Sequence, residues 1–158
     1  RDVAPSRGLG DVYKRQSPGP GIPEEAGDLM AAIGQIVRQR IPVLGICLGH
    51  QALARAFGAE LRQLSAPLHG HPTTLTVTDA GDLLLQKIAP PLIVGRYHSW
   101  IVDPDSMPEE LIASSHDEAG HIMSFYHRNL PIHGVQFHPE SCISNCGPAL
   151  IRNWLATC

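Results

Sequence analysis

Cysteine, histidine and glutamate are the residues of this sequence whose types and spacing could support covalent catalysis. Cys47 lies in residues 45–51 (GICLGHQ), where a short apolar strand is followed by a predicted helix. A sharp strand-to-helix turn exposes a nucleophile, as the G-x-S-x-G turn does for serine. Gly45 and Gly49 would allow the turn and the close approach of other chain segments. The pattern predicts a nucleophilic thiol at this turn.

Cys47 would also lie at the N-terminus of the predicted helix. Free backbone N–H groups and the positive end of the helix dipole favour a thiolate over a thiol at such a position. We therefore expect a reactive sulfur.

A histidine and a glutamate, separated by one proline, form the second chemical group. Residues 134–141 (GVQFHPES) end an apolar strand with His138, Pro139 and Glu140. A cysteine nucleophile needs a base, and the base needs a third group that fixes its tautomer. The restricted φ of Pro139 would hold the two side chains in a set orientation. Taken singly, Cys47 and His138 are more simply a buried cysteine and a strand-end histidine, but together they predict a Cys-His-Glu triad.

Four segments of the chain, taken in order, resemble the signature segments of the class I glutamine amidotransferases. They are SPGPGIP (17–23), GICLGHQ (45–51), GRYHSW (95–100) and GVQFHPES (134–141). RYHSW with HPES most resembles the glutaminase subunit, component II, of anthranilate synthase or of aminodeoxychorismate synthase. The resemblance runs from about Ser17 to the C-terminus, and it implies that Cys47, His138 and Glu140 form the catalytic triad.

The resemblance also implies a glutamine site, and the residues agree with one. The loop SPGPG can approach a ligand with its backbone, so the amide of Gly19 or Gly21, with that of Leu48, is a candidate oxyanion hole. Gln51 follows Cys47 by one helical turn, so its amide would face the same site. The resemblance and this reasoning together assign the following residues to glutamine: Gly19, Pro20, Gly21, Leu48, Gln51, Ser99 and Trp100.

The activity that the resemblance implies is hydrolysis of glutamine to glutamate and ammonia through a glutamyl thioester, without a cofactor. Ammonia released into neutral water is largely protonated, so the domain makes chemical sense when it is docked to a synthase. The implied partner is a chorismate-binding synthase subunit (component I), which would make anthranilate or, as second choice, 4-amino-4-deoxychorismate. Two alternatives stay open: a stand-alone cysteine hydrolase of γ-glutamyl bonds and a catalytically silent regulatory subunit.

Helical and strand patterns alternate from residue 17 onward and predict an α/β fold. Pro23 with Glu24 and Glu25 opens a helix that Pro42 ends. The resemblance implies an open, largely parallel, flavodoxin-like sheet with helices on both faces, and we expect the later strands to be antiparallel. A final helix is predicted near residues 148–155. The strand candidates are 73–78, 92–97, 111–114, 122–126 and 132–137.

The first sixteen residues do not fit this pattern. The family would have a first parallel strand and helix here, and we expect that first strand to be missing from residues 1–16. We interpret 1–16 as a truncated or foreign segment and residues 17–158 as one glutamine amidotransferase domain. A genuine but divergent N-terminus is the alternative. The turn at residues 144–147 (SNCG) also departs from the family, which usually has Thr or Pro near the glycine.

Composition excludes several classes of function. The chain has 158 residues, 43% of them hydrophobic, and a net charge of −3 with scattered Lys and Arg. Nothing in this distribution favours nucleic acid as a partner, and no apolar run is long enough to cross a membrane. We expect a cytoplasmic protein with four reduced cysteines. A metal site that combines Cys142 and Cys146 with His69 and His71 is a weaker alternative to a polar turn around Gly70, so no metal is predicted.

Overall fold

In the computed structural model, residues 21–158 are described. The interpretation of residues 1–16 and the predicted site residues Gly19 and Pro20 therefore lie outside the described part of the chain.

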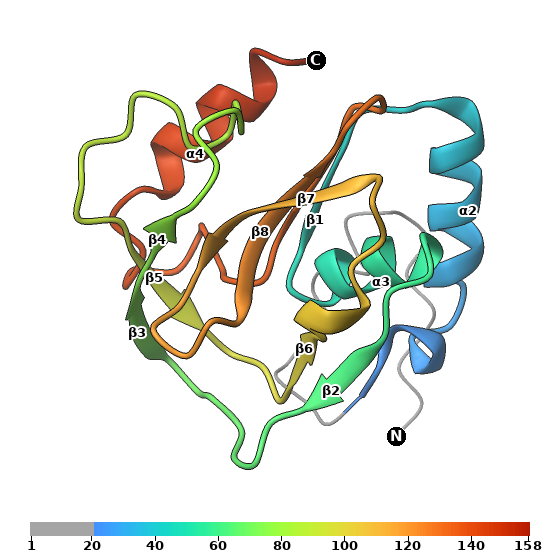
Figure 1. Cartoon of the computed structure of the whole chain (residues 1–158), viewed down its shortest axis with the longest axis horizontal. Helices are drawn as coiled ribbons and strands as arrows, with labels where there is room; N and C mark the ends of the chain where they lie inside the picture. The colour runs from blue at the N-terminus through green and yellow to red at the C-terminus, as the bar shows by residue number, and fades with distance from the viewer. Residues whose placement is uncertain (1–20) are drawn as a thin grey trace, which may run out of the picture.

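A five-stranded sheet forms the centre of the fold (Figure 1). Its strand order is β1-β9-β8-β7-β4, so strands from both halves of the chain lie side by side. The first and last thirds of the described chain therefore meet at the β1–β9 pair. The strands are β1 (Val43–Ile46), β9 (Ile132–Val135), β8 (Ile122–His127), β7 (Leu111–His116) and β4 (Thr76–Val77).

The α/β class is confirmed, and so are the antiparallel later strands, but the expectation of a largely parallel sheet needs correction. Among the described strands, β1 and β9 form the one parallel pair, while β9–β8, β8–β7 and β7–β4 are antiparallel. For the β7–β8 and β8–β9 pairs the reason is connection length, because their short links can join only antiparallel neighbours. Within residues 21–158, β1 is an edge strand, paired on one side.

Two short antiparallel ribbons lie beside the main sheet. One pairs β2 (Leu61–Gln63) with β6 (Trp100–Val102), and the other pairs β3 (His71–Thr74) with β5 (Ile93–Arg96). The strand predicted at 73–78 is divided between β3 and β4. The division falls at Leu75, which is buried and donates its N–H to the carbonyl of Leu92.

Helices cover both faces of the sheet, as predicted (Figure 1). On one face α2 (Leu29–Gln39) and α3 (Leu48–Ala56) enclose an apolar cluster that includes Leu53 and Phe125. On the other face α4 (Gly147–Leu155) packs on a second cluster through Leu150.

The helix predicted to begin at Pro23 forms later than expected. Residues Pro23–Glu25 make a single 3₁₀ turn, η1, and α2 begins at Leu29. Gly27 interrupts the two with φ +59, a left-handed conformation that glycine adopts without steric cost.

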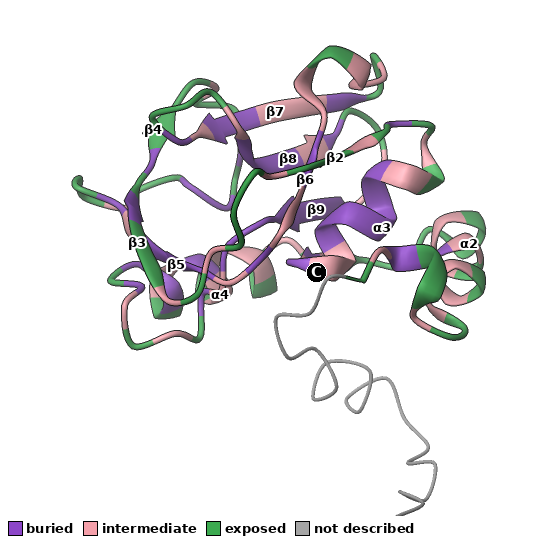
Figure 2. Cartoon of the chain, turned by 90° about the horizontal axis from the view of Figure 1, so that it is seen from below, coloured by how far each residue is buried: buried purple, intermediate pink, exposed green. Residues whose placement is uncertain are grey.

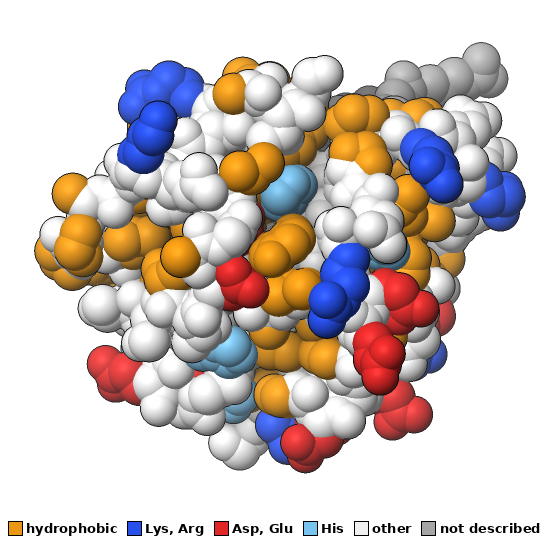
Figure 3. All heavy atoms as spheres, turned by 45° about the horizontal axis from the view of Figure 1, so that its top comes forward, with side chains coloured by type: hydrophobic (Ala, Val, Ile, Leu, Met, Phe, Trp, Pro, Cys, Tyr) orange, Lys and Arg blue, Asp and Glu red, His pale blue; other side chains and the backbone are white. Residues whose placement is uncertain are grey.

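Burial is concentrated in the elements that carry the predicted chemistry. Figure 2 shows α3 and strands β8 and β9 largely buried, whereas α2 is exposed on its outer side. On the face seen in Figure 3, side chains of both charge signs are scattered among apolar ones. No helix within residues 21–158 is long and apolar enough to span a membrane.

Candidate active site

The predicted turn at Cys47 is present and is sterically tight. Cys47 is the N-cap of α3 and has φ 52 and ψ −102, a strained backbone conformation for a residue with a side chain. A Cβ on Gly45 would lie 2.6 Å from the backbone of Gly49 and from the side chain of Leu53. Glycine at position 45 therefore lets α3 pack directly on β1, which fixes the place of the sulfur.

The sulfur of Cys47 is enclosed by protein atoms. Its side chain is 9% exposed, the thiol donates to the carbonyl oxygen of Tyr97 at 3.9 Å, and the sulfur accepts from Nε2 of Gln136 at 3.7 Å. Burial raises the pKa of the Cys47 thiol to about 12. The backbone N–H of Leu48 acts in the opposite direction.

The N-terminus of α3 favours the thiolate of Cys47 as expected, through the Leu48 N–H, but burial outweighs this effect. Desolvation penalises the charged form more strongly than the N–H groups of α3 stabilise it. The negative charge of Glu140 adds to the rise in the pKa of Cys47. A neutral thiol needs a base at the moment of reaction.

The candidate base and its carboxylate partner are joined directly. Nδ1 of His138 lies 2.6 Å from Oε1 of Glu140. Because a carboxylate only accepts hydrogen bonds, Nδ1 of His138 carries the proton of this contact. The His138 side chain is 14% exposed and that of Glu140 is 47% exposed. This contact is the arrangement expected of a base with its orienting group.

The β1–β9 pair brings the two halves of the site together. Ile46 is in register with Val135, and the N–H of Cys47 donates to the carbonyl of Val135 at 2.8 Å. Tyr97 touches both groups, because its carbonyl accepts from the Cys47 thiol and its ring meets the His138 imidazole edge-on at 5.2 Å. Within residues 21–158, no direct hydrogen bond joins the Cys47 sulfur to His138.

Only some of the predicted glutamine-binding residues lie close to the turn at Cys47. Gln51 is 2% exposed, and its Nε2 donates to the carbonyl of Trp100 at 2.8 Å. Leu48 begins α3 beside Cys47, and Ser99 accepts the N–H of Leu64 through its carbonyl. Leu48, Gln51 and Trp100 therefore gather around the turn, and Gly21 is exposed near the start of η1.

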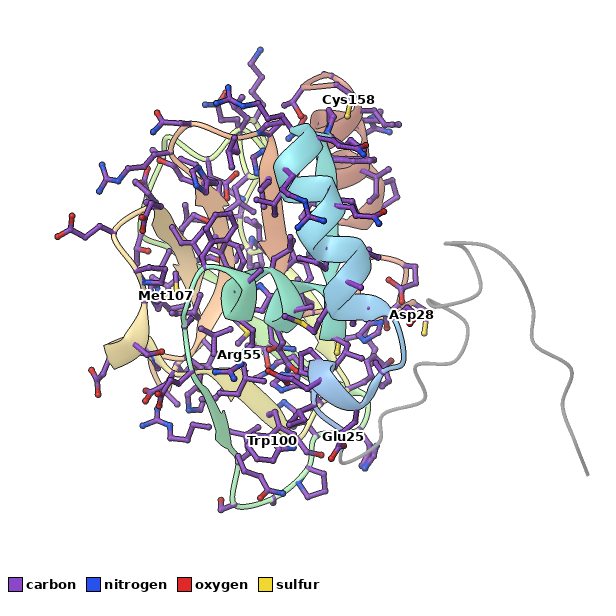
Figure 4. All side chains as sticks on the ribbon, turned by 90° about the vertical axis from the view of Figure 1, so that its right-hand side faces the viewer. Glu25, Asp28, Arg55, Trp100, Met107 and Cys158 are labelled. Carbon is purple, nitrogen blue, oxygen red and sulfur yellow. The ribbon has the colours of Figure 1, made fainter. Side chains whose placement is uncertain are left out.

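A pocket of about 180 Å³ adjoins Trp100, on the side of η1. The ion pair between Arg55 and Glu24, 2.7 Å long, forms part of its wall. Figure 4 shows Arg55, Trp100 and Glu25 toward the same end of the molecule, with Cys158 at the opposite end. None of the predicted catalytic residues lines this pocket, so it flanks the predicted site. Its lining residues are Ile22, Glu24, Arg55, Glu60, Leu61 and Trp100.

The turn after HPES attaches the candidate base to the rest of the fold. Ser144 donates its hydroxyl to the carbonyl of His138 at 2.6 Å and accepts the N–H of Gly95 at 3.0 Å. The N–H of His138 in turn donates to the carbonyl of Gly95 at 3.0 Å. A Cβ on Gly147 would lie 1.8 Å from the carbonyl oxygen of Pro139. The atypical SNCG sequence therefore still makes a closely fitted turn.

One residue of the site was missed in the sequence. Gln136 is 0% exposed and contacts both Cys47 and Gln51. A signal for it existed, because Gln136 is a lone amide in an apolar strand run and shares strand parity with His138.

No group of three or more His, Cys, Asp or Glu side chains within residues 21–158 is placed to bind a metal ion. Gly70 has φ +65 and β3 begins at His71, so the interpretation of this segment as a turn leading into a strand is confirmed. All four cysteines are free thiols.

Comparison with known proteins decides the family. The model of the family described as "Glutamine amidotransferase class-I" matches residues 16–158, nearly the whole chain. The chain belongs to the class I glutamine amidotransferases. The turn at Cys47 and the His138–Glu140 pair lie within the matched region of this amidotransferase domain.

Named relatives include component 2 subunits of two different synthases. Anthranilate synthase component 2 of Mycobacterium tuberculosis is 42% identical over 90% of this chain and 60% of its own length. Aminodeoxychorismate synthase component 2 of Escherichia coli is 42% identical over 88% of this chain and 73% of its own length. The amidotransferase chain thus spans about 60% of the mycobacterial relative.

A solved structure supports the fold. A protein from Thermoplasma acidophilum, described as a putative GMP synthase subunit, superposes with a TM-score of 0.77 over 94% of this chain and 76% of its own, at 24% identity. At that identity the likeness concerns the fold alone.

Proposed function

We propose that this domain hydrolyses glutamine and supplies the ammonia to a chorismate-using synthase, with anthranilate synthase as the first choice and aminodeoxychorismate synthase as the second. The observation that carries the proposal is the convergence of Cys47 and the His138–Glu140 pair on Tyr97. Relatives are named for both synthases. The family membership supports the same chemistry.

The first half of the reaction transfers the glutamyl group to sulfur. Nε2 of His138 takes the thiol proton as the sulfur of Cys47 attacks the side-chain amide carbon of glutamine. Backbone N–H groups of Leu48 and of Gly19 or Gly21 hold the oxyanion. The C–N bond then breaks, His138 returns the proton to the leaving ammonia, and a glutamyl thioester remains.

The second half regenerates the enzyme. His138, oriented by Glu140 at 2.6 Å, takes a proton from water as the water oxygen attacks the thioester carbon. The C–S bond breaks, glutamate leaves and the Cys47 thiol recovers its proton. Because burial raises the pKa of Cys47 to about 12, the thiol needs His138 to take its proton in this reaction.

A coexpression experiment tests both the activity and the partner. The chain is coexpressed with an anthranilate synthase component I or with an aminodeoxychorismate synthase component I, and the product made from chorismate is identified with glutamine or with ammonium as nitrogen source. We expect glutamine-dependent anthranilate. The matched control is Cys47→Ala, which should lose synthesis from glutamine and keep synthesis from ammonium.

The outcomes separate the alternatives. Glutamine-dependent 4-amino-4-deoxychorismate would reassign the partner and leave the chemistry intact. Full glutamine-dependent synthesis by Cys47→Ala would overturn the proposed mechanism. If the wild-type chain and its synthase subunit make product from ammonium but not from glutamine, the alternative of a catalytically silent regulatory subunit is favoured.

A further inference from the structure

Gln136 is a buried polar side chain in contact with the candidate nucleophile, and the mechanism above does not use it. Its side chain is 0% exposed, and it follows β9 directly, two residues before His138. Its Nε2 lies 3.7 Å from the sulfur of Cys47, and its Oε1 lies 3.1 Å from Nε2 of Gln51. A buried amide in a core position needs such partners, because an unmade hydrogen bond there is costly.

Trp100, Gln51 and Gln136 are linked by two consecutive hydrogen bonds. The backbone carbonyl of Trp100 determines the direction of both. The carbonyl of Trp100 can only accept, so Gln51 must turn its NH₂ group toward it, at 2.8 Å. The second N–H of the same NH₂ group then meets Gln136, which must present its oxygen.

The orientation of Gln136 is thereby settled. With its oxygen toward Gln51, its NH₂ group faces the sulfur of Cys47. The opposite orientation would place two NH₂ groups against each other. The backbone carbonyl of Trp100 thus orients the amide of Gln51, which orients the amide of Gln136. As a result, an N–H of Gln136 points at the sulfur of Cys47.

We propose that Gln136 stabilises the thiolate of Cys47 as it forms, and that Gln51 acts as the positioning residue that keeps the Gln136 donor aimed at the sulfur. The proposal deepens the proposed function and rests on Cys47 as its nucleophile. A hydrogen bond from an amide N–H to sulfur becomes charge-assisted when the thiol loses its proton, so it strengthens along the reaction.

This role fits the electrostatics of the turn. Burial and the negative charge of Glu140 both oppose a thiolate at Cys47, and the amide of Gln136 acts against them. The donor is neutral and enclosed by protein, so water does not compete with it for the sulfur.

The test is the alkylation rate of Cys47 in the full chain without glutamine, at one fixed pH between 8 and 9, followed by peptide mass spectrometry at Cys47. Alkylation follows the thiolate fraction. Gln136→Met keeps the length of the side chain and removes the donor, and we expect roughly 10- to 100-fold slower alkylation. Gln51→Met should slow the alkylation of Cys47 less, because the donor of Gln136 is then present but has lost the hydrogen bond that orients it. Gln35→Met, on the exposed side of α2, is the matched control.

Two reagents of different size, iodoacetamide and N-ethylmaleimide, separate a change in thiolate fraction from a change in access. A change in thiolate fraction slows both by the same factor. Alkylation of a folded Gln136→Met at the wild-type rate, or unequal slowing of the two reagents, would overturn the proposal. If Gln136→Met unfolds by circular dichroism, Gln51→Met alone decides, and a wild-type rate in it overturns the proposal. Because no glutamine is present, the result stands apart from whether the chain hydrolyses glutamine.

Discussion

At the scale of single residues, the candidate nucleophile is a protonated thiol. Burial keeps Cys47 a neutral thiol with a pKa of about 12, while His138 has its Nδ1 proton directed to Glu140. A neutral buried thiol is protected from chance oxidation and alkylation, since only the thiolate reacts. On the proposed function, the sulfur is activated when glutamine is bound and His138 can accept its proton.

At the scale of elements, the geometry of the base depends on where α4 begins. Gly147 is the first residue of α4 and lies against the carbonyl of Pro139. Pro139 is the residue between His138 and Glu140 in the sequence. The same turn is attached to β5 by Asn145, whose N–H donates to the carbonyl of Ile93 at 3.0 Å. The helix start and the strand thus set the position of His138 and Glu140.

Gly147→Ala tests this coupling. Its Cβ would lie 1.8 Å from the Pro139 carbonyl oxygen, so the turn must shift. We expect a loss of roughly 1–3 kcal/mol in the free energy of unfolding. We also expect about 10²-fold slower glutamine hydrolysis, because misplacement by about 1 Å has effects of that size. Denaturant unfolding and a coupled glutamate assay in the presence of the synthase subunit measure both.

Gly34→Ala on α2 is the control for this prediction. A Cβ there would meet the flexible end of Arg38 at 3.3 Å, and α2 carries none of the predicted site residues. We expect unchanged hydrolysis and a gain of up to about 1 kcal/mol in stability, from the higher helix propensity of alanine. Wild-type activity in Gly147→Ala would show that α4 does not position the base.

Local signals in the sequence predicted more of the site than of the sheet. The turn at Cys47 and the His138–Glu140 pair follow from glycine, proline and strand-end patterns within a few residues. The arrangement of the sheet does not, because it depends on which strands pair, and the paired strands β1 and β9 are far apart in the sequence. The ribbon strand β2 (LRQ) was missed because three residues with two exposed polar side chains show no alternation. Gln136 was passed over because its partners Gln51 and Cys47 lie more than eighty residues away.

At the scale of the whole molecule, two buried histidines make stability depend on pH. Burial lowers the pKa of His50 to about 3, and burial together with the charge of Arg96 lowers that of His98 to about 3. Both are therefore neutral in the folded protein at pH values where the unfolded chain already binds protons. Stability is fully present above about pH 6.5, the ordinary histidine value, and is lost as the pH falls toward 3.

His50→Leu measures the contribution of one of these groups. Both ring nitrogens of His50 are buried, and within residues 21–158 neither has a partner in good hydrogen-bond geometry, although the backbone of Gly134 acts on the ring. We therefore expect little loss of stability at pH 7.5. Between pH 6.5 and 3, the wild-type free energy of unfolding should fall by up to about 1.4 kcal/mol per pH unit more steeply than that of the variant. Urea titrations at a series of pH values give both slopes. Equal slopes would mean that His50 binds its proton equally in the folded and unfolded states.

The account depends most on a covalent bond between the glutamyl group and the sulfur of Cys47. The direct measurement is mass spectrometry of the acid-quenched chain during turnover of glutamine with the synthase subunit present, with peptide mapping of the modified residue. We predict one glutamyl group on the peptide that contains Cys47, and none in Cys47→Ala, which should also release no ammonia. Sustained ammonia release by Cys47→Ala, or a glutamyl group found on another residue of the wild type, would contradict the account.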